Sequence, residues 1–216
     1  MTIAAITDTL LTYNDIDQQL GLHRTEDPEF FAEWQRPLPP LSRAEVAELD
    51  HLSQRYLTYI EAGEVSEGTL NLIILAPLLN ALGFCDPPYR VRGEAWVQVQ
   101  MPVDEATGIT MLSGRIDALT LQDDVWLVII EGKRGGFNVL QAVPQALGYM
   151  MGNPVASQPS FGLVTNGYDY LFLKATQIPS RQYARSQNFT LLSAPDQNLQ
   201  RVGQVLKHLV TIASGA

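Results

Sequence analysis

Two apolar, strand-like segments that carry charged residues constrain the fold of this chain more than any other feature. Residues 109–121 and 125–133 are separated by only three polar residues, which predicts two antiparallel strands joined by a short turn. Asp117 lies inside the first segment, and Glu131 and Lys133 end the second, directly after an apolar run. An unpaired buried charge is costly, so charges at such places usually have partners or bind a metal. This stretch therefore predicts a specific chemical site.

The remainder of the sequence predicts helices before and after these strands. A capping box at Ser42 and Glu45 begins a helix that we expect to end at Gly63. A second helix is expected from Ser66, with a kink at Pro77. The other expected elements are a strand at 89–101, helical structure at 138–151, strands at 161–165 and 170–174 joined through Asn166-Gly167, and a helix from Pro195. This order predicts an α/β fold with a central mixed sheet of about five strands and helices on both faces.

Length and composition fit one main domain with an appended arm. The chain has 216 residues, of which 46% are apolar and 17% charged, which is typical of a globular protein. We expect an N-terminal arm at residues 1–41, whose aromatic residues pack on the main body, an additional helix at 42–62 and the main domain at 63–216. A single cysteine, no secretory signal and no long apolar stretch favour a cytoplasmic protein without a membrane segment.

The net charge of −9 weighs against a non-specific coat on nucleic acid, which normally needs a basic face. It does not exclude a nuclease in which a metal ion and a few local cations contact phosphate. Basic residues gather in the middle third of the chain. Arg115 lies inside the first of the two charged segments, and Arg134 directly follows the second. These two arginines are the candidates for contact with nucleic acid.

Strand geometry predicts how the charged residues are arranged. Side chains at positions i and i+2 share a face, so Glu131 and Lys133 point the same way, while Gly132 points opposite and leaves its carbonyl accessible. The turn returns the chain and places Asp117 beside Glu131. Two carboxylates and a carbonyl suit Mg²⁺, which keeps several waters of its own. A lysine there can orient or deprotonate a water whose pKa the metal lowers, which is what hydrolysis of a phosphodiester requires.

These residues resemble the PD-(D/E)xK nuclease superfamily. The likeness is carried by Asp117 and, after an apolar strand, by Glu131-Gly132-Lys133. The proline of the family name is absent, and Gly-Arg-Ile-Asp is a frequent variant of that half of the motif. Residues 145–149 are similar to the Q-x-x-x-Y helix of RecB-like members. Residues 67–84 and 163–167 are similar to the nuclease domain in the motor (R) subunit of type I restriction enzymes.

The resemblance implies a restriction-endonuclease-like core over residues 63–216 and a role for each matching residue. Asp117 and Glu131 would bind Mg²⁺ or Mn²⁺, and Glu67 would be a further acidic residue near the metal. Lys133 would position the nucleophilic water. Gln145 and Tyr149 would orient the active-site groups or contact the nucleic-acid backbone.

Pro144, directly before Gln145, complicates the last of these predictions. Proline in a helix interior costs about 3 kcal/mol unless it lies in the first turn. Either the helix begins near Val143, after an earlier turn, or it is kinked at the proline. Gln145 and Tyr149 lie one helical turn apart on one face in both cases.

Each residue also has a purely structural interpretation. Asp117 could cap a turn or pair with Arg115 or Arg134. Glu131 and Lys133 could be an ordinary strand end, and Glu67 a helix N-terminal acid favoured by the helix dipole. Only the conjunction of the motifs, in this order, favours a nuclease.

The first functional hypothesis is a Mg²⁺-dependent nuclease that hydrolyses phosphodiester bonds of DNA in restriction, defence or repair. Related domains work beside a helicase motor or a specificity subunit. This sequence has no P-loop, so we expect either a stand-alone relative or a subunit whose partner is encoded separately. A homodimer could form and would serve double-strand cleavage. The alternative is a non-catalytic nuclease-fold protein that binds nucleic acid or a protein partner, which the acidic composition favours. A metal-dependent phosphatase is a third and weaker hypothesis.

Overall fold

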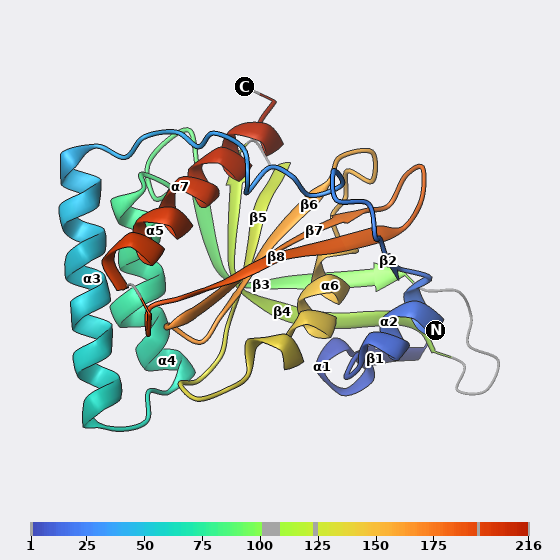
Figure 1. Ribbon diagram of the computed structural model, residues 1–216. Coiled ribbons are helices and arrows are strands. Elements are labelled where there is room, and N and C mark those ends of the chain that lie inside the picture. Colours follow the sequence, from blue (N-terminus) through green and yellow to red (C-terminus); the bar gives the residue numbers. More distant parts are fainter. Residues whose placement is uncertain (1, 101–108, 123–124, 194, 216) are drawn as a thin grey trace.

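An eight-stranded mixed β-sheet runs through the centre of the molecule (Figure 1). The computed structural model describes residues 2–100, 109–122, 125–193 and 195–215. The strands are β1 (Thr2–Ala5), β2 (His23–Arg24), β3 (Arg90–Gln100), β4 (Ile109–Gln122), β5 (Val125–Gly132), β6 (Ser160–Thr165), β7 (Asp169–Thr176) and β8 (Gln182–Thr190). Their order is β1-β4-β5-β6-β7-β8-β2, and β3 is a further partner of β4.

The pairing of the strands follows the predicted pattern in the middle of the chain. β3, β4 and β5 form the expected antiparallel meander, and β5 lies in the interior of the sheet between β4 and β6. β5 and β6 are parallel, while β6, β7 and β8 are antiparallel. β1 runs parallel to β4, and β2 runs parallel to β8. The predicted α/β class, a mixed central sheet flanked by helices, is confirmed.

Seven α-helices, one π-helical turn and one 3₁₀ turn accompany the sheet over the part of the chain that the structure describes. They are α1 (Ile6–Thr9), α2 (Tyr13–Leu20), α3 (Arg43–Ala62), α4 (Glu67–Leu70), η1 (Asn71–Leu75, the π turn), α5 (Ala76–Ala81), η2 (Val139–Gln141, the 3₁₀ turn), α6 (Val143–Met150) and α7 (Pro195–Ala213). Ser42 caps α3 through the predicted capping box, which stabilises the helix start by about 1 kcal/mol. None of the helices so described has the length and apolar character needed to cross a membrane.

Two prolines determine where two of these helices begin. Pro77 lies in the first turn of α5, which continues directly from the π turn that accommodates it. The continuous helix expected from Ser66 is therefore divided into α4, η1 and α5. Pro144 lies in the first turn of α6, which starts at Val143 after a separate 3₁₀ turn. The first of the two alternatives for this helix is confirmed.

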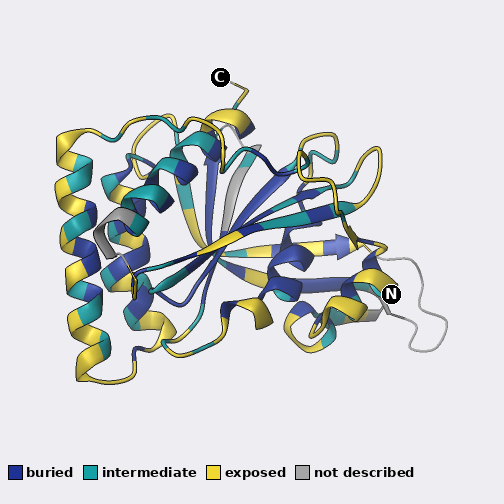
Figure 2. Cartoon of the chain, viewed as in Figure 1, coloured by how far each residue is buried: buried dark blue, intermediate teal, exposed yellow. Residues whose placement is uncertain are grey.

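Side chains alternate between two hydrophobic cores on opposite faces of the sheet. In β7, Tyr170 and Phe172 belong to one core, and Leu171 and Leu173 belong to the other. Helices α3, α4, η1, α5 and α7 cover the first face, and α1, α2 and α6 cover the second. Figure 2 shows the buried residues concentrated on the central strands between these two helical layers. Strand periodicity thus builds a three-layer protein.

The sheet is larger than the five or so strands expected, because β1, β2 and β8 join it. β1 and β2 have only four and two residues, and β8 is rich in polar residues. The N-terminal arm takes part in both cores: Ile6 and Leu10 are buried in the second, and Phe31 is buried in the first. Phe30 and Trp34 pack against the first core, as predicted.

Candidate active site

Strand β4 changes partners along one of its edges. β3 pairs with β4 from Met111 to Leu121 and so occupies one edge. On the other edge, β1 pairs with β4 as far as Ser113, and β5 pairs with it from Ala118 onward. Residues 114–117, the Gly-Arg-Ile-Asp segment, therefore lie in a fork between β1 and β5. Among the described strands, none pairs with this edge of the segment.

The side chain of Tyr149, from α6, fills this fork. The backbone N–H of Arg115 donates a hydrogen bond to the Tyr149 hydroxyl, which satisfies a donor that a neighbouring strand would otherwise bind. A Cβ atom at Gly114 would lie 2.7 Å from Cε1 of Tyr149. Only glycine leaves room for the ring at this position. The first residue of the Gly-Arg-Ile-Asp segment is therefore explained by packing.

The predicted carboxylates and lysine meet where β5 ends. The backbone N–H of Gly132 donates to Oδ2 of Asp117 over 2.7 Å. Nζ of Lys133 donates to Oε1 of Glu131 over 2.6 Å, and these two side chains are 14% and 2% exposed. Glu131 and Lys133 share one face of the chain, as their spacing predicted. Asp117 lies beside the end of β5, which was also predicted.

The end of β5 is held firmly on its remaining sides. The backbone N–H of Lys133 donates to the carbonyl of Thr165 at the end of β6 over 2.7 Å. A Cβ atom at Gly132 would lie 2.9 Å from Cδ2 of Leu70 and 3.1 Å from Cδ1 of Leu75. The glycine between Glu131 and Lys133 thus lets α4 and η1 pack directly on the strand.

The electrostatics of the site show a shortage of positive charge. Burial raises the pKa of Glu131 to about 8, and the negative charge of Asp117 adds to this. Burial also raises the pKa of Asp117, although the hydrogen bond from Gly132 and the charge of Lys133 oppose the shift. Burial acts to lower the pKa of Lys133, but the Glu131 carboxylate outweighs it, and the net pKa is raised. The lysine is therefore a cation at neutral pH.

A divalent cation fits this arrangement. Oε2 of Glu131 is buried and has no hydrogen-bond partner among the described residues, which is costly for a carboxylate oxygen. Asp117 and Glu131 supply the hard oxygen ligands that Mg²⁺ prefers, and each would be stabilised in its ionised form by a nearby cation. Within the described ranges, however, no three acidic, histidine or cysteine side chains lie close enough together to hold a metal. Any cation here would have two carboxylates and take its other ligands from elsewhere.

The other predicted site residues surround this centre at different depths. Glu67, in the first turn of α4, is exposed and acts on all three central groups only through its charge. The structure does not join it to the two carboxylates as a third ligand. Arg115 is exposed and forms an ion pair with Glu94 at 3.0 Å. Arg134 is exposed directly after Lys133.

Gln145 and Tyr149 form a pair, as their spacing predicted. Nε2 of Gln145 donates to the Tyr149 hydroxyl over 2.8 Å. Tyr149 is only 1% exposed, so its predicted contact with nucleic acid does not suit its position behind the site. The hydrogen bond that its hydroxyl accepts from the backbone of Arg115 supports the other alternative, in which Gln145 and Tyr149 orient the active-site segment. Burial raises the pKa of Tyr149 to about 12, so the hydroxyl keeps its proton.

Sequence reasoning gave no role to three residues around the site. The sequence does offer a signal for Gly114, because a glycine inside an apolar strand often marks a place where another group packs closely. Trp96 lies on β3 directly opposite Arg115, and the alternation of Val97 and Val99 with polar neighbours predicts that its face is exposed. Glu94 has a positive φ of 48°, which no sequence pattern indicates.

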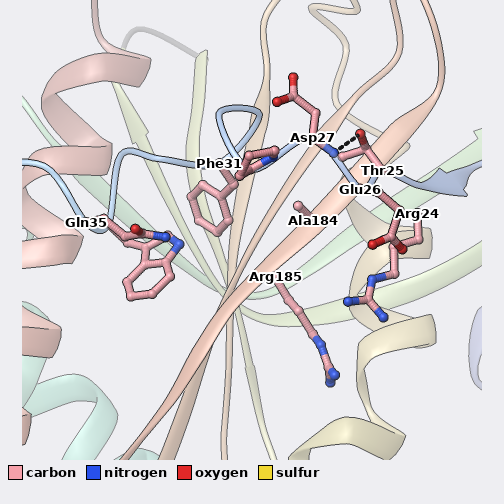
Figure 3. A pocket seen from close by; sticks show the side chains of 10 residues that line it. Arg24, Thr25, Glu26, Asp27, Phe31, Gln35, Ala184 and Arg185 are labelled. Atoms are coloured by element: carbon pink, nitrogen blue, oxygen red, sulfur yellow. Dashed lines mark hydrogen bonds between the residues drawn. The ribbon is translucent and has the colours of Figure 1, made fainter.

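A separate pocket lies near the opposite edge of the sheet, where β2 pairs with β8 (Figure 3). Its lining combines Arg24 and Arg185 with Glu26 and Asp27, so positive and negative charges are mixed. The backbone N–H of Asp27 donates to Oγ1 of Thr25 over 3.2 Å, which closes the loop above the pocket. None of the predicted site residues lines it.

Comparison with solved structures shows a distant structural likeness. No family model and no curated protein matches the sequence. Among solved structures, the chain is similar to a fragment described as an HsdR subunit of a type I restriction enzyme from Vibrio vulnificus YJ016. The TM-score is 0.37 at 17% sequence identity, over 64% of this chain and 25% of that chain. This chain thus spans about a quarter of the length of the protein it matches.

Proposed function

We propose that this protein is a divalent-metal-dependent nuclease that hydrolyses phosphodiester bonds of DNA. One observation carries the proposal. Two carboxylates, the partly buried Asp117 and the buried Glu131, lie beside the partly buried Lys133 at the end of β5, and Oε2 of Glu131 has no hydrogen-bond partner in the part of the chain that the structure describes. Such a group of charges is unfavourable unless a cation completes it. Mg²⁺ or Mn²⁺ is the cation that suits these ligands.

Each residue then has a chemical role. Asp117 and Glu131 would hold the cation through the oxygens that their bonds to Gly132 and Lys133 leave available. The chemistry that Mg²⁺ supplies at such a site is neutralisation of phosphoryl charge and a lower pKa of the attacking water. Lys133 would orient that water and stabilise negative charge on the phosphate; its raised pKa does not suit a general base.

The side chains that fill the fork between β1 and β5 help to position Asp117. Tyr149 binds the backbone of Arg115, and Gln145 binds Tyr149, so α6 holds the segment that ends in Asp117. Tyr149 thereby takes the place of a paired strand at Arg115, two positions before Asp117. We infer that Gln145 and Tyr149 are positioning residues, and that neither touches the DNA.

The test is metal-dependent cleavage by the purified protein. Supercoiled plasmid and circular single-stranded DNA are incubated with Mg²⁺, Mn²⁺ or EDTA. We expect cleavage with either metal, none in EDTA, and loss of cleavage in Lys133→Ala and Glu131→Gln. Binding of Mn²⁺ by calorimetry should weaken in Glu131→Gln and change less in Lys133→Ala.

A matched control is available in the same sheet. Lys174 in β7 forms an ion pair with Glu33, and these side chains are 14% and 13% exposed, close to the exposure of the Lys133 side chain. Lys174→Ala removes a buried ion pair of similar kind away from the site and should retain cleavage when both variants are folded by circular dichroism. Absence of cleavage with every metal and substrate would leave the non-catalytic, nucleic-acid-binding or protein-binding alternative.

A further inference from the structure

The outer face of β3 presents an exposed tryptophan close to the candidate active site. Val97 and Val99 are buried, while Trp96 is 62% exposed and Gln98 is exposed between them. One face of this part of the strand therefore packs on the second core, and the other faces solvent. Figure 2 shows the exposed positions along β3. The indole contributes little to the core, so packing does not explain a side chain of this size.

Trp96 is joined to the active-site segment by the strand register. It lies directly opposite Arg115 on β4, and directly opposed side chains share a face with Cβ atoms about 5 Å apart. Arg115 precedes Asp117 by two residues, which is about 7 Å along a strand. The indole and the guanidinium thus share one face of the β3–β4 ribbon, and Asp117 follows Arg115 two positions later on β4.

Glu94 holds the guanidinium of Arg115 in the free protein. Oε2 of Glu94 accepts a hydrogen bond from Arg115 over 3.0 Å, and the register places Glu94 opposite Asp117, between the pairs Gly93↔Ala118 and Ala95↔Ile116. Among the described residues, Glu94 is the one non-glycine residue with a positive φ. Such strained residues concentrate at functional sites. A phosphate that replaced Glu94 as the partner of Arg115 would release the Glu94 carboxylate from its place beside the like charge of Asp117.

We propose that Trp96 and Arg115 bind an unpaired nucleotide of DNA next to the bond to be cut, with the base stacked on the indole and the phosphate bound by the guanidinium. This rests on the proposed nuclease function and names its substrate as single-stranded DNA or an unpaired end. A base inside a duplex is stacked on its neighbours and is not available to the indole unless it is flipped out. Stacking on an aromatic side chain accepts any base, which suits a site without other base contacts.

Binding in EDTA, where no cleavage occurs, tests this surface separately from catalysis. The affinity of a fluorescein-labelled oligothymidylate and of a duplex of equal length is measured by fluorescence anisotropy. We expect tighter binding of the single strand, a loss of about tenfold or more in Trp96→Ala, and near-complete retention in Trp96→Phe. Tyr59→Ala, which removes an exposed aromatic ring on α3, is the matched control and should bind as the wild type does.

The charged residues give a second, independent measurement. Arg115→Gln should reduce the slope of log affinity against log salt by about 0.7, the value for one phosphate contact to a single strand. Trp96→Ala should leave that slope unchanged, and Glu94→Gln should strengthen binding because Arg115 no longer has a competing carboxylate.

The results separate this proposal from the nuclease proposal. Wild-type affinity in Trp96→Ala, equal binding of duplex and single strand, or no binding of either oligonucleotide would overturn the nucleotide-binding surface, even if plasmid cleavage depends on Lys133. Trp96-dependent binding without metal-dependent cleavage would support the surface and refute the nuclease.

Discussion

The ring of Tyr149 lies directly over Gly114, and a Cβ atom at this glycine would be 2.7 Å from Cε1 of the tyrosine. The same substituent would be 3.1 Å from the Tyr149 hydroxyl and 3.4 Å from Cβ of Ile6. The aromatic ring, the glycine and the fork between β1 and β5 therefore depend on one another. This contact fixes the start of the segment that ends in Asp117.

Gly114→Ala should destabilise the protein by about 1–3 kcal/mol, because the added methyl group overpacks a buried contact that cannot expand. The free energy of unfolding in urea is the measurement. Gly93→Ala is the matched control on the neighbouring strand, since its Cβ would make an ordinary contact of 3.8 Å with the carbonyl oxygen of Asp117. Equal unfolding free energies for the two variants would show that Tyr149 does not occupy the fork.

The stability of the metal-free protein should fall as the pH rises from about 4.5 to about 8. The pKa of Glu131 is raised from 4.5 to about 8 in the folded protein, so the folded state binds this proton more strongly than the unfolded state. This proton therefore stabilises the folded state fully when the pH is below the unfolded pKa of 4.5, and the stabilisation is lost as the pH rises through the folded pKa of about 8. Thermal unfolding in EDTA should show this decline in the wild type and a flatter profile in Glu131→Gln. Added Mg²⁺ at pH 8 should raise the melting temperature of the wild type more than that of Glu131→Gln.

Glu45 provides a control of opposite sign for this measurement. Burial acts to raise its pKa, but hydrogen bonds from Lys207 and Ser42 outweigh it, and the pKa is lowered. Its stabilisation is therefore present above the ordinary pKa and is lost as the pH falls. Glu45→Gln should change the acid side of the stability profile and leave the decline toward pH 8 in place.

Tyr149→Phe should destabilise the protein by about 1–3 kcal/mol, because the backbone N–H of Arg115 loses its acceptor in the fork. Gln145→Ala removes the second donor to the same hydroxyl. The two substitutions should be non-additive by about 0.5 kcal/mol or more in a double-mutant cycle of unfolding free energies. Additive effects would mean that Gln145 and Tyr149 act separately.

Gly167→Ala should be among the most disruptive single substitutions in the chain. Gly167 has a φ of +93°, and a Cβ atom there would lie 2.1 Å from Cζ of Tyr56. The Tyr56 hydroxyl donates to the carbonyl of Asn166, so its ring cannot move away without losing that bond. Gly83 has a similar φ of +79° and no atom within 4 Å of such a Cβ. Gly83→Ala therefore introduces backbone strain without a clash. The further decrease in melting temperature of Gly167→Ala below that of Gly83→Ala measures the clash with Tyr56.

The sequence predicted the central meander and its charged residues because both depend on local rules. Alternation and short polar connectors define β3 to β5, and the i, i+2 relation places Glu131 and Lys133 on one face. The start of α6 at Val143 is one of the two alternatives that the restriction on Pro144 left open. Each of these features is determined by residues close together in the chain.

The missed features depend on contacts between distant segments. β8 is buried at positions such as Ser186, whose hydroxyl donates to the carbonyl of Gln187 and accepts from the N–H of Phe172, so its polar sequence hides a strand. β1 has four residues and pairs with a strand more than a hundred positions later, and no local pattern indicates such a pairing. The exposure of Trp96 beside Arg115 likewise requires the register of two strands.

The fork also has a practical consequence for work with this protein. One continuous strand carries both the last contact with β1, at Ser113, and the carboxylate of Asp117 four positions later. Residues added ahead of Thr2, such as an affinity tag, would adjoin β1 and could shift the active-site segment without touching it. Recombinant protein for cleavage and binding assays should therefore carry its tag after α7, or have an N-terminal tag removed before measurement.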